Sequence, residues 1–374
     1  MTPLRIALVA EDYYPQLGGV PEHVHNLARE LEALGHHAII VTSNMKEPGA
    51  GSQEPVEHAD VRRVGTSVVI YANGGVARIT VGWRLTKRLE ELFRAERFDV
   101  VHVHGGLNPT LGLVAPRAAW RLGLPVVATF HTWFPSSVAC RVFRRPLQRM
   151  LDRHAATIAV SSAARDAMAR YFTAPWEIIP NGVDTRFFRP GLSKGAPGPR
   201  LLWLGRIEPR NDLGTVLAAM PRILERHPAA HLTVVGDGPW RSRMERAARR
   251  GGLGPCVHFV GYANGGRPGY YRGADVYLCP TRRASFGVTL LEAMACGTPL
   301  VVSDIPAFRD LAGDSHAVFA PPGDPAGWGR AVNDLIDDGA RRETMMQEGR
   351  RVAERHAWPL VAQRVLAVYR RVTG

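Results

Sequence analysis

One stretch decides the fold of this 374-residue chain: Asp275–Asp304, which reads DVYLCPTRRASFGVTLLEAMACGTPLVVSD. It begins with an apolar run of strand length that Pro280 ends. A segment with helical apolar spacing starts at Val288, and Ser285 stands before it in a position typical of a helix N-cap. Gly297 then predicts the end of the helix, and a second apolar run follows. The stretch therefore predicts strand, loop, helix and strand, the repeating unit of a parallel α/β sheet.

The loop before the predicted helix is a natural anion site, because backbone N–H groups and the helix dipole at a helix N-terminus both favour negative charge. Glu292 lies about two turns into this helix, where a carboxylate can accept hydrogen bonds from a diol such as a ribose. Taken alone, a solvated glutamate on a helix face is the simpler interpretation. The strand, loop and helix pattern around Glu292 favours the interpretation that it binds a diol.

Length and composition fit two globular domains, since 374 residues with 45% apolar side chains suffice for two cores. No run of about 18 apolar residues predicts a membrane span. The N-terminus, MTPLRIALVAEDYYP, is typical of an opening strand and not of a signal peptide. The four cysteines show no CxxC spacing, which predicts a reduced, cytoplasmic protein without a disulfide or zinc site.

The net charge of +13 has several candidate causes. No zinc-finger, RNP or basic-zipper signature is present, so a nucleic-acid partner is not expected. A phosphate-bearing ligand or anionic lipid headgroups explain the charge equally well, and so does a generally Arg-rich proteome.

The first half of the chain alternates predicted strands and helices. A buried strand at 6–10 is followed by Gly18 and Gly19 and then by a helix at 21–34, so the two glycines let the backbone approach a ligand at a helix start. A plain tight turn explains two such glycines as often. His104 and His131 follow two further strands, at 100–103 and 126–130, and ligands of parallel sheets bind beyond such strand ends.

The remaining candidates in this half are weaker. The spacing of the other histidines does not indicate metal ligands, so we expect them at the surface or in the core: His23, His25, His36, His37 and His154. An exposed loop is predicted at 46–60 and a β-hairpin at 68–81 with its turn at 73–75. No DxD triplet occurs, so no carboxylate pair for a metal-bound diphosphate is expected. A tightly bound cofactor is not expected either.

Two amphipathic stretches are strongly basic: 83–93, with Arg84, Lys87, Arg88, Arg94 and Arg97 in and around it, and 141–154. A solvated helix face is one interpretation, and a patch for an anionic membrane surface is the other.

The segment 180–200 is rich in Pro and Gly and is interpreted as an interdomain linker. The strand and helix pattern then restarts. We therefore predict an α/β fold with two Rossmann-like, doubly wound domains that face each other across a cleft, at residues 1–185 and 186–358. The last helix, at 359–374, is expected to return to the first domain.

Several motifs together resemble family 4 retaining glycosyltransferases with the GT-B fold, and within them the phosphatidylinositol mannosyltransferases. The motifs occur in family order along nearly the whole chain: PQLGGVPEHVHNLA, ATFHTWFP, IPNGVDTRFF, LGRIEPRNDLGTVLAAMP, VVGDGP and SFGVTLLEAMACGTPLVVSD. The resemblance implies transfer of a hexose, mannose or glucose, from a GDP- or UDP-sugar to a hydroxyl acceptor such as a lipid headgroup. Together with the cysteines and the two basic stretches, it predicts a cytoplasmic protein that is peripheral on the inner face of the membrane, and the absence of a DxD triplet predicts no requirement for a divalent metal.

The resemblance also assigns roles to single residues. Arg206 would bind the donor diphosphate and stabilise the leaving group, His131 would contact the transferred sugar, and Glu292 would hold the ribose. Residues expected at the donor phosphates and sugar are Gly18, Gly19, Gly236, Phe286, Gly287 and Val288.

Two positions depart from the family pattern. Asn211 stands where the family has a phosphate-binding lysine, and Ala284 stands where it has the first glutamate of a Glu-x7-Glu pair. Arg210, Arg282 or Arg283 are candidates to replace the missing cation. A degenerate GT-B protein that binds without turnover is therefore an alternative function, and another GT-B reaction such as epimerisation is a second.

Overall fold

A computed structural model describes residues 2–16, 18–44, 60–72, 75–191, 198–263 and 265–374. The chain forms two compact units, one of residues 1–181 with 358–374 and the other of residues 182–357. Most of the predicted loop at 46–60, residues 73 and 74 of the predicted turn, and residues 192–197 of the predicted linker lie outside the described residues. Within the described residues, no helix combines the length and hydropathy needed to cross a membrane.

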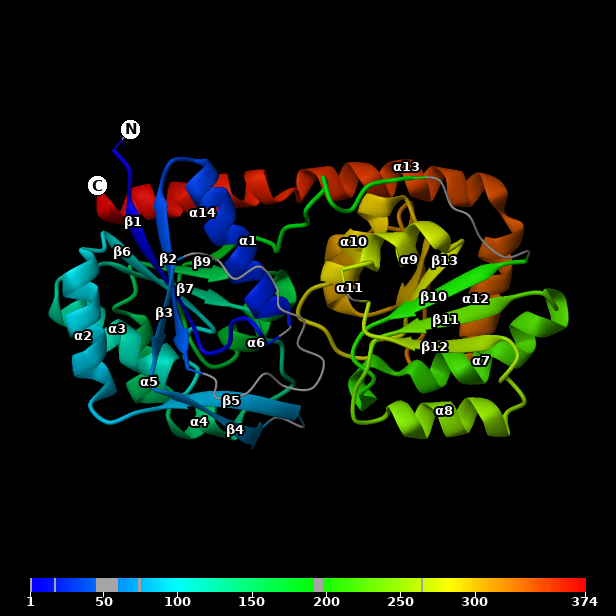
Figure 1. Ribbon diagram of the computed structural model, residues 1–374, viewed down its shortest axis with the longest axis horizontal. Helices are drawn as coiled ribbons and strands as arrows, with labels where there is room; N and C mark the ends of the chain where they lie inside the picture. Colours follow the sequence, from blue (N-terminus) through cyan, green and yellow to red (C-terminus); the bar gives the residue numbers. More distant parts are fainter. Residues whose placement is uncertain (1, 17, 45–59, 73–74, 192–197, 264) are drawn as a thin grey trace. The chain divides into compact units, whose positions relative to one another are not determined.

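The first unit is built on a parallel sheet with the described strand order β3-β2-β1-β6-β7-β8-β9 (Figure 1). Its strands are β1 (Arg5–Ala10), β2 (His37–Ser43), β3 (Val61–Val64), β6 (Val100–His104), β7 (Val126–Phe130), β8 (Ala156–Ala159) and β9 (Trp176–Ile178). Its helices are α1 (Gly19–Ala33), α2 (Leu85–Glu96), α3 (Leu111–Arg121), α4 (Val138–Val142), α5 (Arg144–Leu151), α6 (Ser162–Ala169) and α14 (Trp358–Thr373). Strands β4 (Thr66–Ala72) and β5 (Gly75–Val81) pair separately as the predicted antiparallel hairpin.

Alternate residues of β1 show why this sheet is covered on both faces, because successive side chains of a strand point to opposite faces. Ile6 and Leu8 pack in a core with α1 and α14, whereas Ala7 and Val9 pack in a second core with α2 and α3. Helix α14 lies beside α1 through Trp358 and its apolar face (Figure 1). The predicted doubly wound sheet is therefore confirmed for this unit.

The second unit has a parallel sheet with the described order β12-β11-β10-β13-β14-β15. Its strands are β10 (Arg200–Leu204), β11 (His231–Val235), β12 (Val257–Gly261), β13 (Val276–Cys279), β14 (Leu300–Ser303) and β15 (Val318–Ala320). Its helices are η1 (Pro209–Asn211), α7 (Leu213–Arg226), α8 (Arg241–Arg250), α9 (Arg267–Gly273), α10 (Val288–Cys296), α11 (Pro306–Leu311), α12 (Pro325–Asp337) and α13 (Gly339–Arg355). Each sheet reverses its strand order beside its first strand, at β1/β6 and at β10/β13, and such switch points are where α/β sheets bind ligands.

The deciding stretch folds as β13, α10 and β14, as predicted, with one correction. Helix α10 begins at Val288 with Gly287 as its N-cap and no side-chain cap, so the assignment of Ser285 as N-cap is wrong. The apolar spacing located the helix but not its first residue. Gly297 ends the helix at a φ of 74°, a left-handed conformation that glycine adopts without steric cost.

Candidate active site

In the first unit, the start of α1 is open to a ligand. Gly18 and Gly19 are exposed, and no side chain caps the helix. A Cβ atom added at Gly19 would meet no atom within 4 Å. The N–H groups of this helix start are therefore available to an anion, as expected for a helix N-terminus that lies after a strand.

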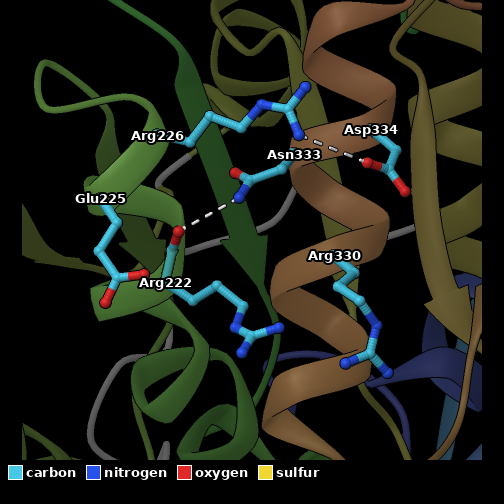
Figure 2. A pocket seen from close by; sticks show the side chains of 6 residues that line it. All are labelled: Arg222, Glu225, Arg226, Arg330, Asn333 and Asp334. Atoms are coloured by element: carbon cyan, nitrogen blue, oxygen red, sulfur yellow. Dashed lines mark hydrogen bonds and ion pairs between the residues drawn. The ribbon is translucent and has the colours of Figure 1, made fainter.

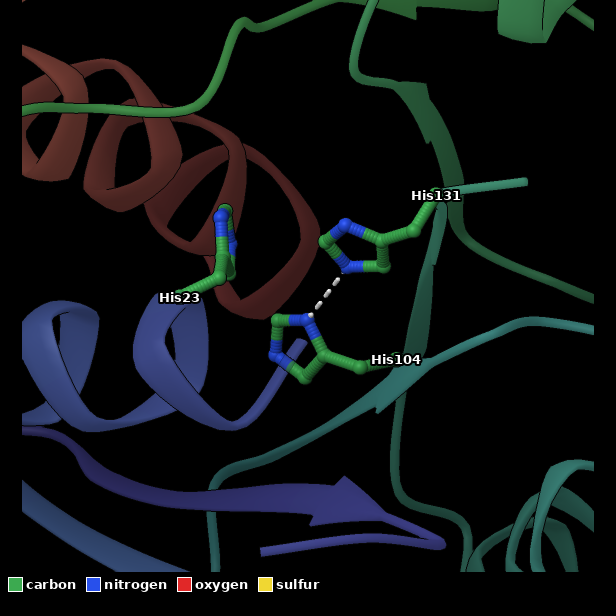
Figure 3. A group of neighbouring side chains, drawn as sticks. All are labelled: His23, His104 and His131. Carbon is green, nitrogen blue, oxygen red and sulfur yellow. Dashed lines mark hydrogen bonds between the residues drawn. The ribbon is translucent and has the colours of Figure 1, made fainter. Parts of the chain in front are cut away.

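Histidines gather where β6 and β7 end in the same unit (Figure 3). His104 is the last residue of β6, and His131 follows β7. His104 Nδ1 lies 3.2 Å from His131 Nε2. His23 of α1 joins them, with ring centroids 5.2 Å from His104 and 4.7 Å from His131. Sequence reasoning missed His23, because only the packing of α1 on the sheet brings it to these strand ends.

All of these imidazoles are neutral at physiological pH. Burial lowers the pKa of His23 to about 4 and that of its neighbour His102 to about 3. Burial also lowers the pKa of His104 and His131 well below the usual range, and the neighbouring histidines lower both further. A neutral His131 can exchange hydrogen bonds with a sugar hydroxyl without placing a charge there.

We expect acid to destabilise the first unit through these histidines. In the unfolded chain they titrate near pH 6.5, so below that pH the unfolded state binds more protons than the folded state. The contribution of each neutral histidine to the free energy of unfolding is therefore fully present above about pH 6.5. It falls towards pH 4 by up to about 1.4 kcal/mol per pH unit for each histidine. Thermal melts between pH 7 and 4 measure the slope. A His23→Gln variant should flatten it and His258→Gln, at an exposed position, should not; equal slopes in all three would contradict the explanation.

In the second unit, Arg206 lies in the loop that follows β10, at the switch point of the sheet. Its guanidinium Nε is 3.5 Å from Glu208 Oε2, and about half of its side chain is exposed. Arg210 contacts the same carboxylate. Arg206 is therefore held loosely at the surface, where an anionic ligand can compete with Glu208, whereas Arg210 is hydrogen-bonded to that carboxylate.

Asn211, the residue in place of the family lysine, fixes the shape of this loop. Its Nδ2 donates to the backbone oxygen of Arg206 at 2.8 Å. The candidate substitutes for the lysine differ in their surroundings. Arg282 donates to Asp212 at 2.6 Å, and Arg210 pairs with Glu208, whereas Arg283 is exposed and makes no ion pair with the described residues.

Gly236 follows β11 and has a packing reason to be glycine. Its φ is 127°, and a Cβ atom there would lie 1.9 Å from the carbonyl oxygen of Gly205. The close approach of these two loops explains the glycine without a ligand, so its predicted donor contact stays a prediction.

The start of α10 provides a second helix N-terminus in this unit. Gly287 is buried, Val288 is half-buried, and no side chain caps the helix. A Cβ atom at Gly287 would lie 3.2 Å from Leu290 and Leu311 side-chain atoms. The half-buried Phe286 precedes the helix, and its ring lies 6.3 Å from that of His356.

Glu292 is buried, so the solvated-face interpretation of this residue is wrong. Its Oε1 accepts from Arg267 Nη1 at 2.9 Å, and its Oε2 accepts from the Tyr271 hydroxyl at 2.8 Å. Both donors come from α9, and sequence reasoning missed them. Their spacing of four residues, which places both on one helix face, is the signal that was available. These two contacts orient the carboxylate of Glu292, and a carboxylate has the lone pairs to accept more than two hydrogen bonds.

Comparison with known proteins identifies the family. Residues 17–187 match the Glycosyltransferase Family 4 model, and residues 198–338 match the Glycosyl transferases group 1 model. A "Phosphatidyl-myo-inositol mannosyltransferase" of Mycolicibacterium smegmatis is 33% identical over 99% of this chain and 95% of its own length. A protein of the same name from Propionibacterium freudenreichii is 31% identical over 98% of this chain and 94% of its own length. The chain belongs to glycosyltransferase family 4.

Solved structures support the GT-B fold of this family 4 glycosyltransferase. Sucrose-phosphate synthase from Thermosynechococcus elongatus superposes with a TM-score of 0.76 at 23% identity, over 99% of both chains. Anabaena HepE in complex with UDP superposes with a TM-score of 0.80 at 16% identity, over 98% of this chain and 100% of that one. The predicted fold, enzyme class and family are confirmed, and the protein is a hexosyltransferase.

One pocket of the glycosyltransferase lies away from the strand ends that carry the candidate active-site residues. It has a volume of about 430 Å³ and lies between α7 and α12 (Figure 2). Its lining residues are Arg222, Glu225, Arg226, Arg330, Asn333 and Asp334. Internal contacts occupy several of them, such as Asn333 Nδ2 to the Arg222 carbonyl oxygen at 3.2 Å. None of the six belongs to a strand-end loop, so the pocket is not part of the candidate active site.

Proposed function

We propose that this glycosyltransferase moves a hexose, with retention of anomeric configuration, from a nucleoside diphosphate sugar to a hydroxyl of a phosphatidylinositol-type lipid. One observation supports the donor part: Arg206 follows β10 and the buried Glu292 lies in α10, which follows β13, and these are the two strands at the switch point of the second unit. The acceptor part rests on full-length relatives whose names specify phosphatidyl-myo-inositol.

The proposed roles follow from chemistry. Arg206 and the α10 start at Gly287 and Val288 bind the diphosphate, and Glu292 accepts hydrogen bonds from ribose hydroxyls. In the first unit, Gly18 and Gly19 offer N–H groups to phosphate and His131 contacts a sugar hydroxyl. Arg210 supplements the phosphate charge in place of the lysine that Asn211 replaces.

In the proposed reaction, the bond between the sugar C1 and the phosphate oxygen breaks while the acceptor oxygen bonds to C1 on the same face. The acceptor proton passes to the departing phosphate oxygen, so no side chain needs to act as a general base. Arg206 stabilises the charge that develops on the diphosphate, where preorganised donors have their largest effect. The neutral His131 orients the sugar during the transfer.

Calorimetric titration tests the donor site, with GDP, UDP, ADP and their sugar conjugates, each with and without Mg²⁺. We expect micromolar binding of one nucleotide and its sugar conjugate, which identifies the base, and equal affinity without the metal. If the protein binds none of these nucleotides, the proposed donor site is wrong, and a GT-B protein without turnover becomes the better explanation.

The lipid acceptor implies contact with a membrane, and α4 and α5 of the first unit support it. Val138, Val142 and Phe143 each leave more than half of their side chain exposed. Exposed arginines surround them: Arg141, Arg144, Arg145 and Arg149. Apolar side chains among cations suit an interface with anionic lipid. Trp83, 81% exposed beside the basic α2, adds a second site of this kind.

We expect a Val142→Asp, Phe143→Asp double variant to bind anionic vesicles at least about 10-fold more weakly, because insertion of these side chains contributes roughly 1.5–3 kcal/mol each. Sedimentation with phosphatidylinositol vesicles at low and high salt measures the effect. Leu360→Asp, also at an exposed apolar position of the first unit, is the control. Equal binding of the double variant and the control would exclude α4 as the membrane contact.

A further inference from the structure

His23, His104 and His131 each offer one ring nitrogen, and these three nitrogens lie within 4.8 Å of one another (Figure 3). They come from α1, from the end of β6 and from the residue after β7. In the part of the chain that the structure describes, no other group of three His, Cys, Asp or Glu side chains is gathered in this way. We call these residues the histidine trio.

Asn181 prepares His23 as a ligand. Its Oδ1 lies 2.8 Å from His23 Nδ1, and both side chains are buried. An amide oxygen only accepts, so Nδ1 carries the hydrogen and Nε2 keeps its lone pair. Metal-binding histidines are oriented in this way, through a hydrogen bond from the second nitrogen to a protein oxygen.

The neighbouring His102 shows how a purely structural histidine differs from the trio. Its Nδ1 lies 2.5 Å from the Tyr369 hydroxyl and its Nε2 lies 2.7 Å from Thr129 Oγ1, so both nitrogens are occupied. By contrast, the buried Nε2 of His104 has no hydrogen-bond partner among the described residues. The protein offers Nε2 no partner that fixes the tautomer of His104, so its Nδ1, which faces His131 at 3.2 Å, can present a lone pair.

One pair of nitrogens in the trio already has the spacing that a small transition ion needs, and His23 lies within 4.8 Å of both, so a modest side-chain movement would complete the site. His104 Nδ1 and His131 Nε2 are 3.2 Å apart. Two tetrahedral ligands at the usual Zn–N distance are separated by about 3.4 Å. Burial lowers the pKa of all three imidazoles, so their lone pairs are available at neutral pH and a metal displaces no proton. Imidazole ligands without a carboxylate favour zinc, copper and nickel over magnesium or calcium.

We propose that the histidine trio binds one Zn²⁺ ion, with the fourth coordination position open beside the half-buried His131. The binding itself is independent of the transferase function. One consequence rests on the proposed function: because His131 contacts the transferred sugar, a bound ion occupies its nitrogen and inhibits transfer. The trio is then an inhibitory metal site in an enzyme whose reaction needs no metal.

Titration of the tag-free, full-length protein with Co²⁺ and then Zn²⁺ tests the site. We expect one equivalent of Co²⁺ to give the visible absorption of four-coordinate cobalt, and one equivalent of Zn²⁺ to remove it. Asn181→Ala should weaken Zn²⁺ binding about 10- to 100-fold, as loss of an outer-shell partner does, and His23→Ala should weaken it further. His37→Ala and His258→Ala, at exposed positions, should leave the affinity unchanged.

Circular dichroism shows which variants are folded. The cobalt spectrum of the wild type tests the site even if a variant does not fold. Absence of one-to-one binding by the wild type would overturn the site, as would unchanged affinity in folded His23→Ala. The inhibition has its own readout, because chelation should restore the turnover that Zn²⁺ removes. Zn²⁺ that binds the trio without lowering turnover would overturn the inhibitory role alone, and a failed donor titration would leave the metal result intact.

Discussion

Arg206→Ala is expected to lower kcat about 100- to 1000-fold, the effect of removing one preorganised donor from a developing negative charge. Arg206 follows β10 at the sheet's switch point, and among the described residues its guanidinium makes one ion pair, with Glu208 at 3.5 Å. Its charge is therefore available to a diphosphate. Steady-state transfer rates measure the loss.

Two further variants separate this role from general charge effects. Arg206→Lys keeps the charge but loses the bidentate geometry of the guanidinium, so it should recover only part of kcat. Arg246→Ala removes an exposed arginine of α8 in the same unit and should leave kcat unchanged. Equal rates for Arg206→Ala and Arg246→Ala would remove Arg206 from the mechanism.

Glu292→Ala is expected to affect stability and donor binding together. The change leaves the fully buried Tyr271 hydroxyl and the largely buried Arg267 without their carboxylate. Loss of one partner of a buried ion pair costs about 3–5 kcal/mol. For a unit of this size that corresponds to a melting temperature lower by roughly 10 °C. Thermal melts with and without nucleotide measure both effects.

Conservative variants distinguish the contribution of Glu292 to stability from its contribution to donor binding. Glu292→Gln keeps the volume and one acceptor oxygen, so the fold should survive while nucleotide affinity falls. Tyr271→Phe removes one hydrogen bond, worth about 1 kcal/mol of stability, and leaves the carboxylate oxygens for the ribose. If Glu292→Gln binds nucleotide as tightly as the wild type does, the proposed ribose contact is wrong.

The secondary-structure elements that short local sequence patterns determine could be predicted from the sequence. Near-continuous apolar runs such as 6–10 and 276–279 become buried parallel strands, because helices cover both faces of such sheets. The positions of His104 and His131 at strand ends followed from the same runs. The exact start of α10 did not follow, because Ser285 has the chemistry of an N-cap but the chain turns into the helix only at Gly287.

What the sequence did not predict depends on packing between elements far apart in the chain. His23 reaches the strand ends only because α1 packs on the sheet, and Asn181, which binds its ring, lies 158 residues away. Arg267 and Tyr271 belong to a short helix with two glycines, whose composition gives a weak helical signal. The role of Asn211 in holding the Arg206 carbonyl likewise needed the folded loop.

Transfer to a lipid acceptor tests the central claim most directly. The purified protein is incubated with phosphatidylinositol vesicles and each nucleoside diphosphate hexose, and the lipid product is analysed by mass spectrometry and by NMR of the anomeric proton. The account predicts one hexose added to the inositol headgroup, with the donor's anomeric configuration retained, and product formation about 100- to 1000-fold slower with Arg206→Ala. An inverted product, or no transfer from any donor that the protein binds, would contradict it.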